Sequence, residues 1–261
     1  MSNVSISTNK LTIGYRTASG GEHIVQTDLS FSLNAGEMVC MLGPNGCGKS
    51  TLLRTLAGLQ PALEGEFKLS TSDFTTSLNS KLSTLNSRDI ALVLTERLSM
   101  DNTTVHDVVA MGRYPYTSFL GGLSAEDEVI IEEALRQVGF DLSTFNFHLS
   151  FFNAHSDGEK QRILIAKALA QQTPIILLDE PTAHLDLPHR ILILRLLRNL
   201  AHEQGKTILI STHELDLALA LSDRILLMTP GKGIRLDTAE NLKKVDAFTR
   251  AFNMDIFNPL G

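Results

Sequence analysis

Short apolar runs recur along this chain, and stretches with helical character separate several of them. Each run is bounded by turn or helix signals, which is typical of a strand buried on both faces of a sheet. Strands and helices that alternate in this way are joined by right-handed crossovers, so the sequence predicts an α/β fold with a mainly parallel sheet. The predicted strands are Met38–Leu42, Ile90–Leu94, Ile175–Leu178, Thr207–Ile210 and Arg224–Met228, and the predicted helices include Lys49–Leu59, Glu159–Gln171, His189–Glu203 and Leu215–Leu221.

One part of the chain departs from this alternation. Residues 95–155 have a mostly helical pattern and indicate an inserted helical subdomain. Its clearest helix has Ser124 as N-cap, Asp127 three residues later and Gly139 at its end. Ser70–Ser87 is rich in Ser, Thr and Asn and is predicted to be an exposed connection. Residues 236–261 form a C-terminal tail, whose Phe248, Phe252 and Phe257 fit a core or a surface equally well.

A glycine-rich segment follows the first strand of the predicted parallel sheet. It matches G-x-x-x-x-G-K-[ST] and lies between the strand and an apolar helix, where backbone N–H groups and the helix N-terminus can bind phosphate oxygens. We expect Lys49 to reach the β- and γ-phosphates of a nucleotide and Ser50 to bind Mg²⁺. The segment is Gly43, Pro44, Asn45, Gly46, Cys47, Gly48, Lys49, Ser50 and Thr51.

Two acidic residues end another predicted strand. Asp179 and Glu180 follow Ile175–Leu178, and the end of a parallel strand lies at the edge of the sheet where ligands bind. We expect Asp179 to hold Mg²⁺ through its water shell and Glu180 to polarise an attacking water as a general base. Such a pair is a weak signal alone and becomes a strong one when it follows a phosphate loop.

Composition excludes some classes of protein. The chain has 261 residues, 43% of them hydrophobic, and a formal net charge of −6, which argues against a protein that binds nucleic acid by neutralising phosphates. No apolar run approaches the roughly 20 residues that cross a bilayer, and the polar N-terminal residues lack the apolar core of a secretory signal. We therefore expect a cytosolic protein with Cys40 and Cys47 as reduced thiols.

Further motifs resemble those of the ATP-binding-cassette (ABC) ATPases. Ser156-Asp-Gly-Glu-Lys-Gln161 resembles the signature motif, and Asp179-Glu-Pro-Thr-Ala-His-Leu-Asp186 resembles a Walker B motif that continues into the D-loop. His213 resembles the switch histidine, and Tyr15 matches the aromatic residue that stacks on adenine. The resemblance extends from about residue 11 to about residue 230. A P-loop kinase or switch would have no use for a signature motif.

This resemblance implies a fold, a reaction and partners. It implies one ABC ATPase domain over residues 1–261, with a P-loop (RecA-like) core at 1–94 and 156–235, an antiparallel β portion near the N-terminus, a helical subdomain at about 95–155 and the tail at 236–261. It also implies ATP and Mg²⁺ as ligands and a homodimer in which each ATP lies between the phosphate loop of one subunit and the signature of the other. Glu180 and His213 would be catalytic, and Asp186 would couple the two sites. The signature residues Ser156, Asp157, Gly158 and Glu159 would lie at the partner's site, where Ser156 and the Gly158 backbone N–H would contact the γ-phosphate.

The sequence departs from the family pattern at two places. In the signature, His155, Asp157 and Glu159 replace the usual Leu, Gly and Gln, so two carboxylates would lie beside a triphosphate unless they point away. We expect Asp157 to face outward. At the Q-loop position the family has Gln, whereas this chain offers Thr95 and Glu96 as candidates.

A last segment resembles one class of ABC ATPase. Gly112-Arg-Tyr-Pro115 looks like the Gly-Arg-x-Pro segment of importer ATPases for iron-siderophores, haem and cobalamin, in which this region receives a permease; it could also be a loop with a structural Pro. The resemblance implies two integral-membrane permease subunits docked on the helical subdomain, an external substrate-binding protein acting indirectly, and a place on the inner face of the cell membrane. The alternatives are a soluble ABC ATPase that acts on ribosomes or DNA and the ATPase of an exporter.

Overall fold

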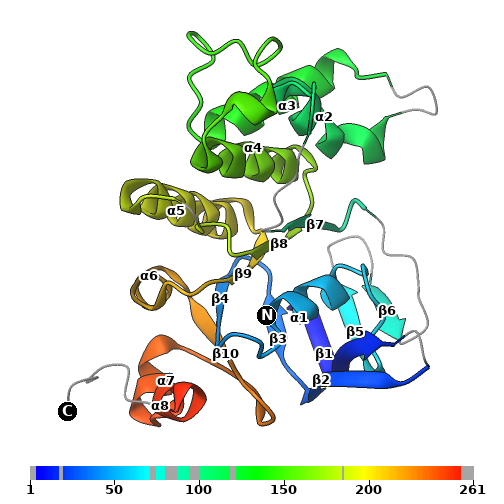
Figure 1. The fold of residues 1–261 in the computed structure, drawn as a ribbon, viewed down its shortest axis with the longest axis vertical. Coiled ribbons are helices and arrows are strands. Elements are labelled where there is room, and N and C mark those ends of the chain that lie inside the picture. The colour runs from blue at the N-terminus through cyan, green and yellow to red at the C-terminus, as the bar shows by residue number, and fades with distance from the viewer. Residues whose placement is uncertain are drawn as a thin grey trace.

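A computed structural model describes residues 4–17, 20–70, 75–79, 87–94, 100–117, 122–183 and 185–253 of the chain. Its centre is a six-stranded sheet with the order β11-β10-β4-β9-β8-β7 (Figure 1). The five strands from β10 to β7 are parallel to their neighbours, and β11 is antiparallel to β10. The strands are β4 (Met38–Leu42), β7 (Ile90–Val93), β8 (Ile175–Asp179), β9 (Thr207–Ser211), β10 (Arg224–Thr229) and β11 (Gly233–Asp237). The predicted parallel sheet is therefore confirmed.

A second, antiparallel sheet comes mainly from the N-terminal part of the chain. Its order is β2-β1-β5-β6, and β3 pairs with β1 beside this path. The strands are β1 (Val4–Arg16), β2 (Glu22–Leu29), β3 (Ser32–Asn34), β5 (Glu64–Ser70) and β6 (Thr75–Asn79). The interpretation of Ser70–Ser87 as a plain connection was wrong in part, because the backbone of β6 forms a ladder with β5. A run of Ser and Thr carries little hydrophobic pattern, so the strand left no signal of its own.

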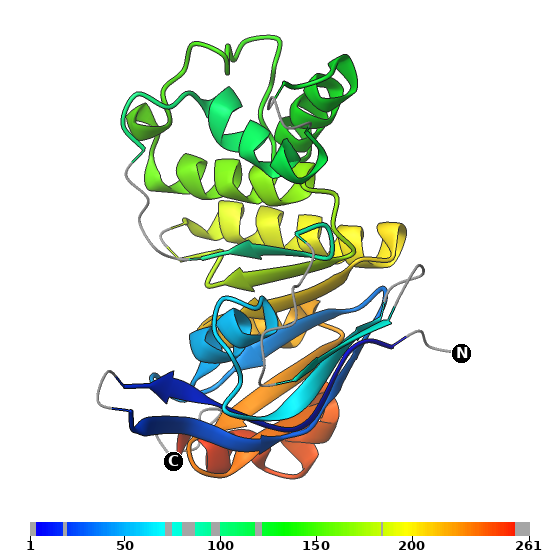
Figure 2. The same ribbon diagram turned by 90° about the vertical axis from the view of Figure 1, so that its right-hand side faces the viewer.

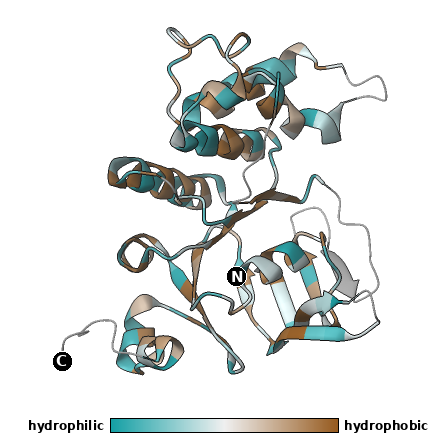
Figure 3. Ribbon diagram, viewed as in Figure 1, coloured by the Kyte–Doolittle hydropathy of each residue, from teal (hydrophilic) through white to brown (hydrophobic). Residues whose placement is uncertain are grey.

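The two faces of the parallel sheet belong to two hydrophobic cores. Val39 and Met41 of β4 face the antiparallel sheet and α1 (Lys49–Leu56), whereas Met38, Cys40 and Leu42 face the opposite side. This alternation follows from the two-residue period of a strand. All residues of β4, β8 and β9 are buried, which explains why each strand is a continuous apolar run. Figure 3 shows hydrophobic segments on strands of this sheet and also on the helices around it.

Helices cover the other face of the sheet and extend into a helical region. Figure 2 shows α2, α3 and α4 grouped at one end of the molecule, the sheet in the middle and the antiparallel strands at the other end. α4 packs against α2, α3 and β7, and so joins the helical region to the sheet. The elements are α2 (Val105–Ala110), the 3-10 helix η1 (Met111–Tyr116), α3 (Ala125–Gln137), the 3-10 helix η2 (Phe152–Ala154), α4 (Asp157–Ala170), α5 (Leu187–Gln204), α6 (Leu215–Leu221), α7 (Ala239–Lys244) and α8 (Ala247–Phe252).

The Gly-Arg-x-Pro segment lies in η1 and fastens the helical region to the end of α4. The buried guanidinium of Arg113 pairs with Asp127 of α3 at 2.7 Å and donates to the carbonyl of Ala170 at 2.8 Å. It also stacks on the ring of Tyr116 at 4.1 Å. A Cβ on Gly112 would lie 2.3 Å from the carbonyl oxygen of Lys167, so this position requires glycine for close packing. The segment thus has a structural role in this chain.

The ends of the elements agree closely with the sequence patterns, except in the tail. Ser124 caps α3 in a capping box with Asp127, as predicted. The tail after β11 folds into α7 and α8, and Phe248 is buried in the core beside β10. Phe252 packs against the same core, and Phe257 lies outside the described residues. None of the helices in the described ranges is long and apolar enough to cross a membrane.

Candidate functional site

Three neighbouring strands, β4, β9 and β8, end at the same edge of the parallel sheet. Met41 of β4 is in register with Ser211 of β9, and Ser211 is in register with Asp179 of β8. The loop after β4 is the predicted phosphate loop, β9 leads to His213, and β8 leads to Glu180. The topology therefore brings together three motifs that are far apart in the sequence, at the place where parallel sheets bind ligands.

The phosphate loop wraps around the side chain of its own lysine. Lys49 begins α1 and is buried, and its Nζ donates to the carbonyls of Gly43 at 2.9 Å and Pro44 at 3.3 Å. Gly48 precedes the helix with a φ of 103°, and a Cβ there would lie 2.7 Å from Val25. Both the backbone conformation and the close packing therefore require glycine at this position. The loop places a buried ammonium at the N-terminus of a helix, which is a favourable site for an anion.

The aromatic residue predicted to face adenine is tied to the same helix. Tyr15 lies on β1 opposite His23, with its ring half-exposed. Its hydroxyl is 2.6 Å from Oγ1 of Thr51, in the first turn of α1. An exposed ring fixed beside the phosphate loop presents a flat surface on which a base can stack.

Ser211 organises the two acidic residues after β8. Its hydroxyl donates to Oδ1 of the buried Asp179 at 2.5 Å, while the backbone N–H of Glu180 donates to the hydroxyl and carbonyl oxygens of Ser211 at 3.0 and 3.1 Å. Glu180 has a φ of 47°, which is unusual for a residue with a side chain. Strained backbone of this kind is held by its surroundings and is common at functional sites. Here the contacts with Ser211 hold the backbone of Glu180 in this conformation.

His213 faces Glu180 across the ends of β9 and β8. Its Nε2 lies 2.5 Å from Oε1 of Glu180, and both side chains are part-exposed. A carboxylate and an imidazole side by side can bind a water and a phosphate oxygen between them. The two predicted catalytic residues are thus brought together.

The residues at this edge fit ATP and Mg²⁺. Ser50 is the second residue of α1, and Asp179 lies at the end of a strand of the same sheet. One hydroxyl and one carboxylate, completed by phosphate oxygens and water, form a donor set that Mg²⁺ accepts. The buried ammonium of Lys49 supplies the charge that a triphosphate needs. Cys47 is also buried in this loop, and burial raises the pKa of its thiol.

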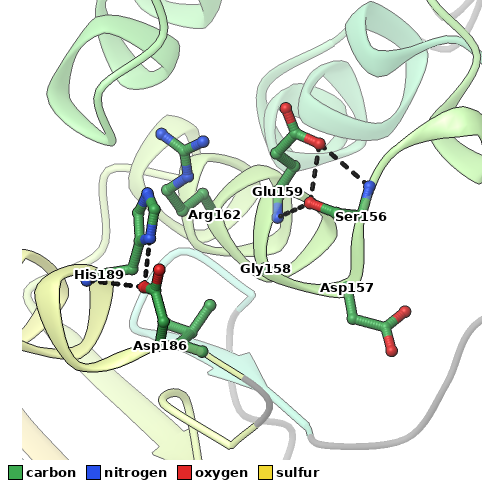
Figure 4. A pocket seen from close by; sticks show the side chains of 8 residues that line it. Ser156, Asp157, Gly158, Glu159, Arg162, Asp186 and His189 are labelled. Atoms are coloured by element: carbon green, nitrogen blue, oxygen red, sulfur yellow. Dashed lines mark hydrogen bonds and ion pairs between the residues drawn. The ribbon is translucent and has the colours of Figure 1, made fainter.

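The signature residues lie in a separate pocket of about 560 Å³ (Figure 4). Residues of the D-loop and of α5 line this pocket with them, whereas the phosphate loop does not. In Figure 4 the carboxylate of Asp157 points away from Asp186, His189 and Arg162. The pocket is lined by Ser156, Asp157, Gly158, Glu159, Arg162, Leu185, Asp186 and His189.

Capping interactions hold two acidic groups of this pocket. Asp186 is the N-cap of α5 and accepts from both the backbone N–H and the imidazole Nδ1 of His189. The hydrogen bond from that imidazole is the main reason why the pKa of Asp186 is lowered. Glu159 completes a capping box at the start of α4, and the hydrogen bond from the Ser156 hydroxyl lowers the pKa of Glu159. Both groups are therefore ionised at neutral pH.

Some residues that shape the site were not predicted. Gln26 of β2 is buried and donates from Nε2 to the carbonyls of Cys47 at 3.1 Å and Thr229 at 3.0 Å, so it links the phosphate loop to β10. A single Gln in a strand gives no signal in one sequence. Arg162 and His189 join the pocket only through the fold of α4 and α5. The Q-loop candidates Thr95 and Glu96 lie outside the described residues.

The chain is similar in sequence to known ABC proteins. A family model described as "ABC transporter" matches residues 26–183. The iron(3+)-hydroxamate import ATP-binding protein of Bacillus subtilis is 36% identical over 252 residues, which cover 96% of this chain and 88% of that protein.

Solved structures agree with this similarity. An inward-facing metal-chelate type ABC transporter has a chain that superposes with a TM-score of 0.77 at 29% identity, covering 96% of this chain and 90% of that one. A dimeric ATP-binding cassette bound to ADP and Pi superposes with a TM-score of 0.75 at 26% identity, covering 90% and 98%. The matches cover most of the chain, and the phosphate loop and the signature pocket agree with them. This chain therefore belongs to the ABC transporter family.

Proposed function

We propose that this protein binds and hydrolyses ATP to power an ABC importer for an iron-siderophore or a related metal chelate such as haem or cobalamin. The observation that carries the proposal is the meeting of the phosphate loop, the Asp179–Glu180 pair and His213 at one edge of the sheet. The similar proteins named for iron(3+)-hydroxamate import and for a metal-chelate transporter support the choice of cargo.

Each group at the sheet edge has a separate task in this proposal. The Tyr15 ring stacks on the base, and residues 43–51 bind the phosphates, with the Lys49 ammonium released from its own loop carbonyls to the β- and γ-phosphates. Ser50 and Asp179 would hold Mg²⁺, which neutralises charge on the phosphate oxygens. Glu180 orients a water and accepts its proton as the water oxygen attacks the γ-phosphorus. The bond from this phosphorus to the β–γ bridging oxygen breaks, and ADP leaves with that oxygen. His213 donates a hydrogen bond to a γ-phosphate oxygen.

One chain contains each half of a site, and the halves lie in different places. The signature pocket does not share residues with the phosphate loop, so a second copy, arranged head to tail, would complete two symmetric sites. The dimeric cassette with bound ADP and Pi supports the pairing of two copies. In the proposed dimer, the Ser156 side chain and the backbone N–H of Gly158 contact the partner's γ-phosphate. Asp157 and Glu159 belong to the same signature segment, and Asp186 couples the two sites. Hydrolysis would then weaken the dimer and open it.

The division of labour along the chain follows from the same proposal. Residues 1–94 and 156–235 form the nucleotide-binding core, about 95–155 form the helical subdomain, and 236–261 form a tail. Two permease subunits dock on the helical subdomain from within the membrane, an external substrate-binding protein delivers the cargo to them, and the ATPase stays at the cytoplasmic face. Thr95 and Glu96 remain the candidates for the Q-loop.

The proteins that bind this chain in native membranes test the transport function most directly. Glu180→Gln keeps the shape of the side chain but removes the base, so the variant should hold ATP and keep the complex assembled. A tagged variant is purified from solubilised native membranes in ATP, and co-purifying proteins are identified by mass spectrometry. We expect a permease with many membrane spans. Ribosomal or DNA-bound proteins alone would contradict the transport function, and a permease fused to its own ATPase would indicate an exporter.

A further inference from the structure

Glu159 occupies both hydrogen-bond donors of Ser156. Its Oε2 accepts from the backbone N–H of Ser156 at 3.0 Å and from the Ser156 hydroxyl at 2.8 Å, and the Glu159 N–H donates to the same hydroxyl oxygen at 3.3 Å. Figure 4 shows these three contacts at the rim of the pocket. The serine of the signature therefore has its only hydroxyl proton directed to an internal carboxylate.

This contact competes with a phosphate. A hydroxyl carries one proton, so Ser156 can donate to Glu159 or to a phosphate oxygen of the partner's nucleotide, but not to both. The competitor is a charged acceptor, because hydrogen bonds from Ser156 lower the pKa of Glu159. Charge-assisted hydrogen bonds are stronger than neutral ones, so releasing the hydroxyl has a cost. The carboxylate also adds negative charge to the pocket that an anion must enter.

His155 offers the Glu159 carboxylate a second hydrogen-bond partner. Its Nδ1 lies 3.6 Å from Oε2 of Glu159, and its Nε2 lies 2.7 Å from the hydroxyl of Ser150. The imidazole meets the ring of Phe145 edge-on at 5.5 Å and is largely buried. Packing and the Ser150 contact thus hold the imidazole beside Glu159, at a distance that a small rotation of the carboxylate would close to a hydrogen bond.

We propose that Glu159 and His155 are positioning residues that control when Ser156 can bind the triphosphate held by a second copy of this chain. In the free chain Glu159 holds the Ser156 hydroxyl. When the partner's nucleotide arrives, the carboxylate turns toward His155, and the Ser156 hydroxyl keeps its proton but donates its hydrogen bond to a phosphate oxygen instead. The exchange raises the ATP concentration at which two copies pair. This proposal rests on the head-to-tail dimer of the proposed function.

A simple helix cap would behave differently. Gln fits a capping box as well as Glu does, so Glu159→Gln keeps the start of α4 but removes the charge and weakens the hold on the hydroxyl. If Glu159 were only a cap, this variant would pair like the parent or less well. If Glu159 competes with the phosphate, the variant pairs more readily. Glu159→Ala removes the carboxylate and its capping contact together, so the difference between Glu159→Ala and Glu159→Gln measures what the capping contact contributes.

The experiment measures pairing as a function of ATP. All variants carry Glu180→Gln so that ATP is not consumed, and the dimer fraction is read by light scattering on a sizing column. Affinity for a fluorescent ATP analogue is measured at protein concentrations too low for pairing. Glu240→Gln on the exposed surface of α7 makes the same change in net charge and serves as the matched control.

We expect Glu159→Gln to pair at an ATP concentration about three- to tenfold lower than the parent, with unchanged ATP affinity of the monomer. His155→Leu should pair only at a several-fold higher ATP concentration, because the released Glu159 carboxylate loses its second hydrogen-bond partner. The double variant should match Glu159→Gln alone, because His155 acts through Glu159.

Pairing of Glu159→Gln at the parent's ATP concentration or above it would overturn the proposal, as would an equal effect of Glu240→Gln. An effect of His155→Leu that persists in the double variant would remove His155 from it. A parent that binds ATP but never pairs would contradict the head-to-tail dimer itself, and this outcome is separate because it appears before any change at Glu159.

Discussion

The imidazole Nε2 of His213 lies 2.5 Å from the carboxylate Oε1 of Glu180, and Ser211 holds the backbone of Glu180 in a strained conformation behind this contact. Neither residue is near the other in sequence. Parallel pairing of β8 with β9 brings them together, with Asp179 opposite Ser211. A γ-phosphate and a water that enter between these side chains would replace their direct contact. Glu180 would then bind the water, and His213 would bind a phosphate oxygen.

His213→Ala should therefore slow hydrolysis much more than it weakens binding. Loss of a group that binds the γ-phosphate oxygen in the transition state costs about 10²-fold or more in turnover. Single-turnover hydrolysis and equilibrium binding of a fluorescent ATP analogue separate the two quantities. His202→Ala, which removes an exposed imidazole bound to Asp223, is the control and should keep the turnover of the parent. A fall in ATP affinity that accounts for the whole loss of activity would contradict this role.

The hydroxyl of Tyr15 should contribute to nucleotide binding through Thr51. Tyr15→Phe keeps the ring for stacking and removes the hydrogen bond of 2.6 Å, so affinity for ATP should fall by about two- to tenfold. Tyr15→Ala should lose more, because the stacking surface goes as well. Titration with a fluorescent ATP analogue measures both, with Tyr114→Phe on the exposed surface of η1 as the control. Equal affinities of Tyr15→Ala and the parent would show that the base lies elsewhere.

Gly112 should tolerate no side chain. In Gly112→Ala the new Cβ would lie 2.3 Å from the carbonyl oxygen of Lys167, and overpacking of this kind costs about 1–3 kcal/mol. Thermal unfolding of this variant should occur at a lower temperature than that of the parent. At Gly122 an added Cβ meets nothing within 4 Å, so Gly122→Ala should unfold with the parent. An unchanged midpoint for Gly112→Ala would mean that η1 and α4 do not pack as described.

The ion pair of Arg113 with Asp127 should make part of the stability depend on pH. Hydrogen bonds from the Ser124 backbone and then from Arg113 lower the pKa of Asp127, so its contribution is present above the unfolded pKa near 3.9 and is lost as the pH falls through the lower folded pKa. At pH 7, Asp127→Asn leaves a buried guanidinium without its counter-ion and should cost about 3–5 kcal/mol.

Urea unfolding from pH 7 to about pH 2, which covers the unfolded pKa and the lowered folded pKa, checks both parts of this prediction. The difference between Asp127→Asn and the parent should shrink as the parent protonates, whereas Glu126→Gln in the same turn should differ by no more than about 1 kcal/mol throughout. A difference that stays constant with pH would mean that Asp127 does not titrate with the stability.

How far the sequence predicts this protein depends on which residues make the contact. The strands β4 and β8, the phosphate loop and the cap of α3 follow local rules, and the structure has them where the pattern places them. The position of these motifs at one sheet edge can also be predicted, because the carboxyl ends of parallel strands lie at the same edge of a sheet.

Contacts between distant segments left no such signal. Three contacts depend on side chains that meet only after folding. They are the hydrogen bond from Gln26 to Cys47, the contacts of Arg113 with α3 and α4, and the burial of Phe248. β6 was missed because Ser and Thr fit a strand and a loop alike. The signature carboxylates could be predicted in part. Their charge is evident from the sequence, whereas the capping box in which Glu159 binds Ser156 was seen only in the structure.

The central claim is that Glu180 is the base of an ATPase, and the turnover of purified Glu180→Gln tests it most directly. Phosphate release is measured under single-turnover conditions in ATP and Mg²⁺, with Glu240→Gln as a control of equal charge. We predict a loss of at least about 10²-fold for Glu180→Gln, with ATP binding retained and the control unchanged. Hydrolysis by Glu180→Gln at the rate of the parent would contradict the account.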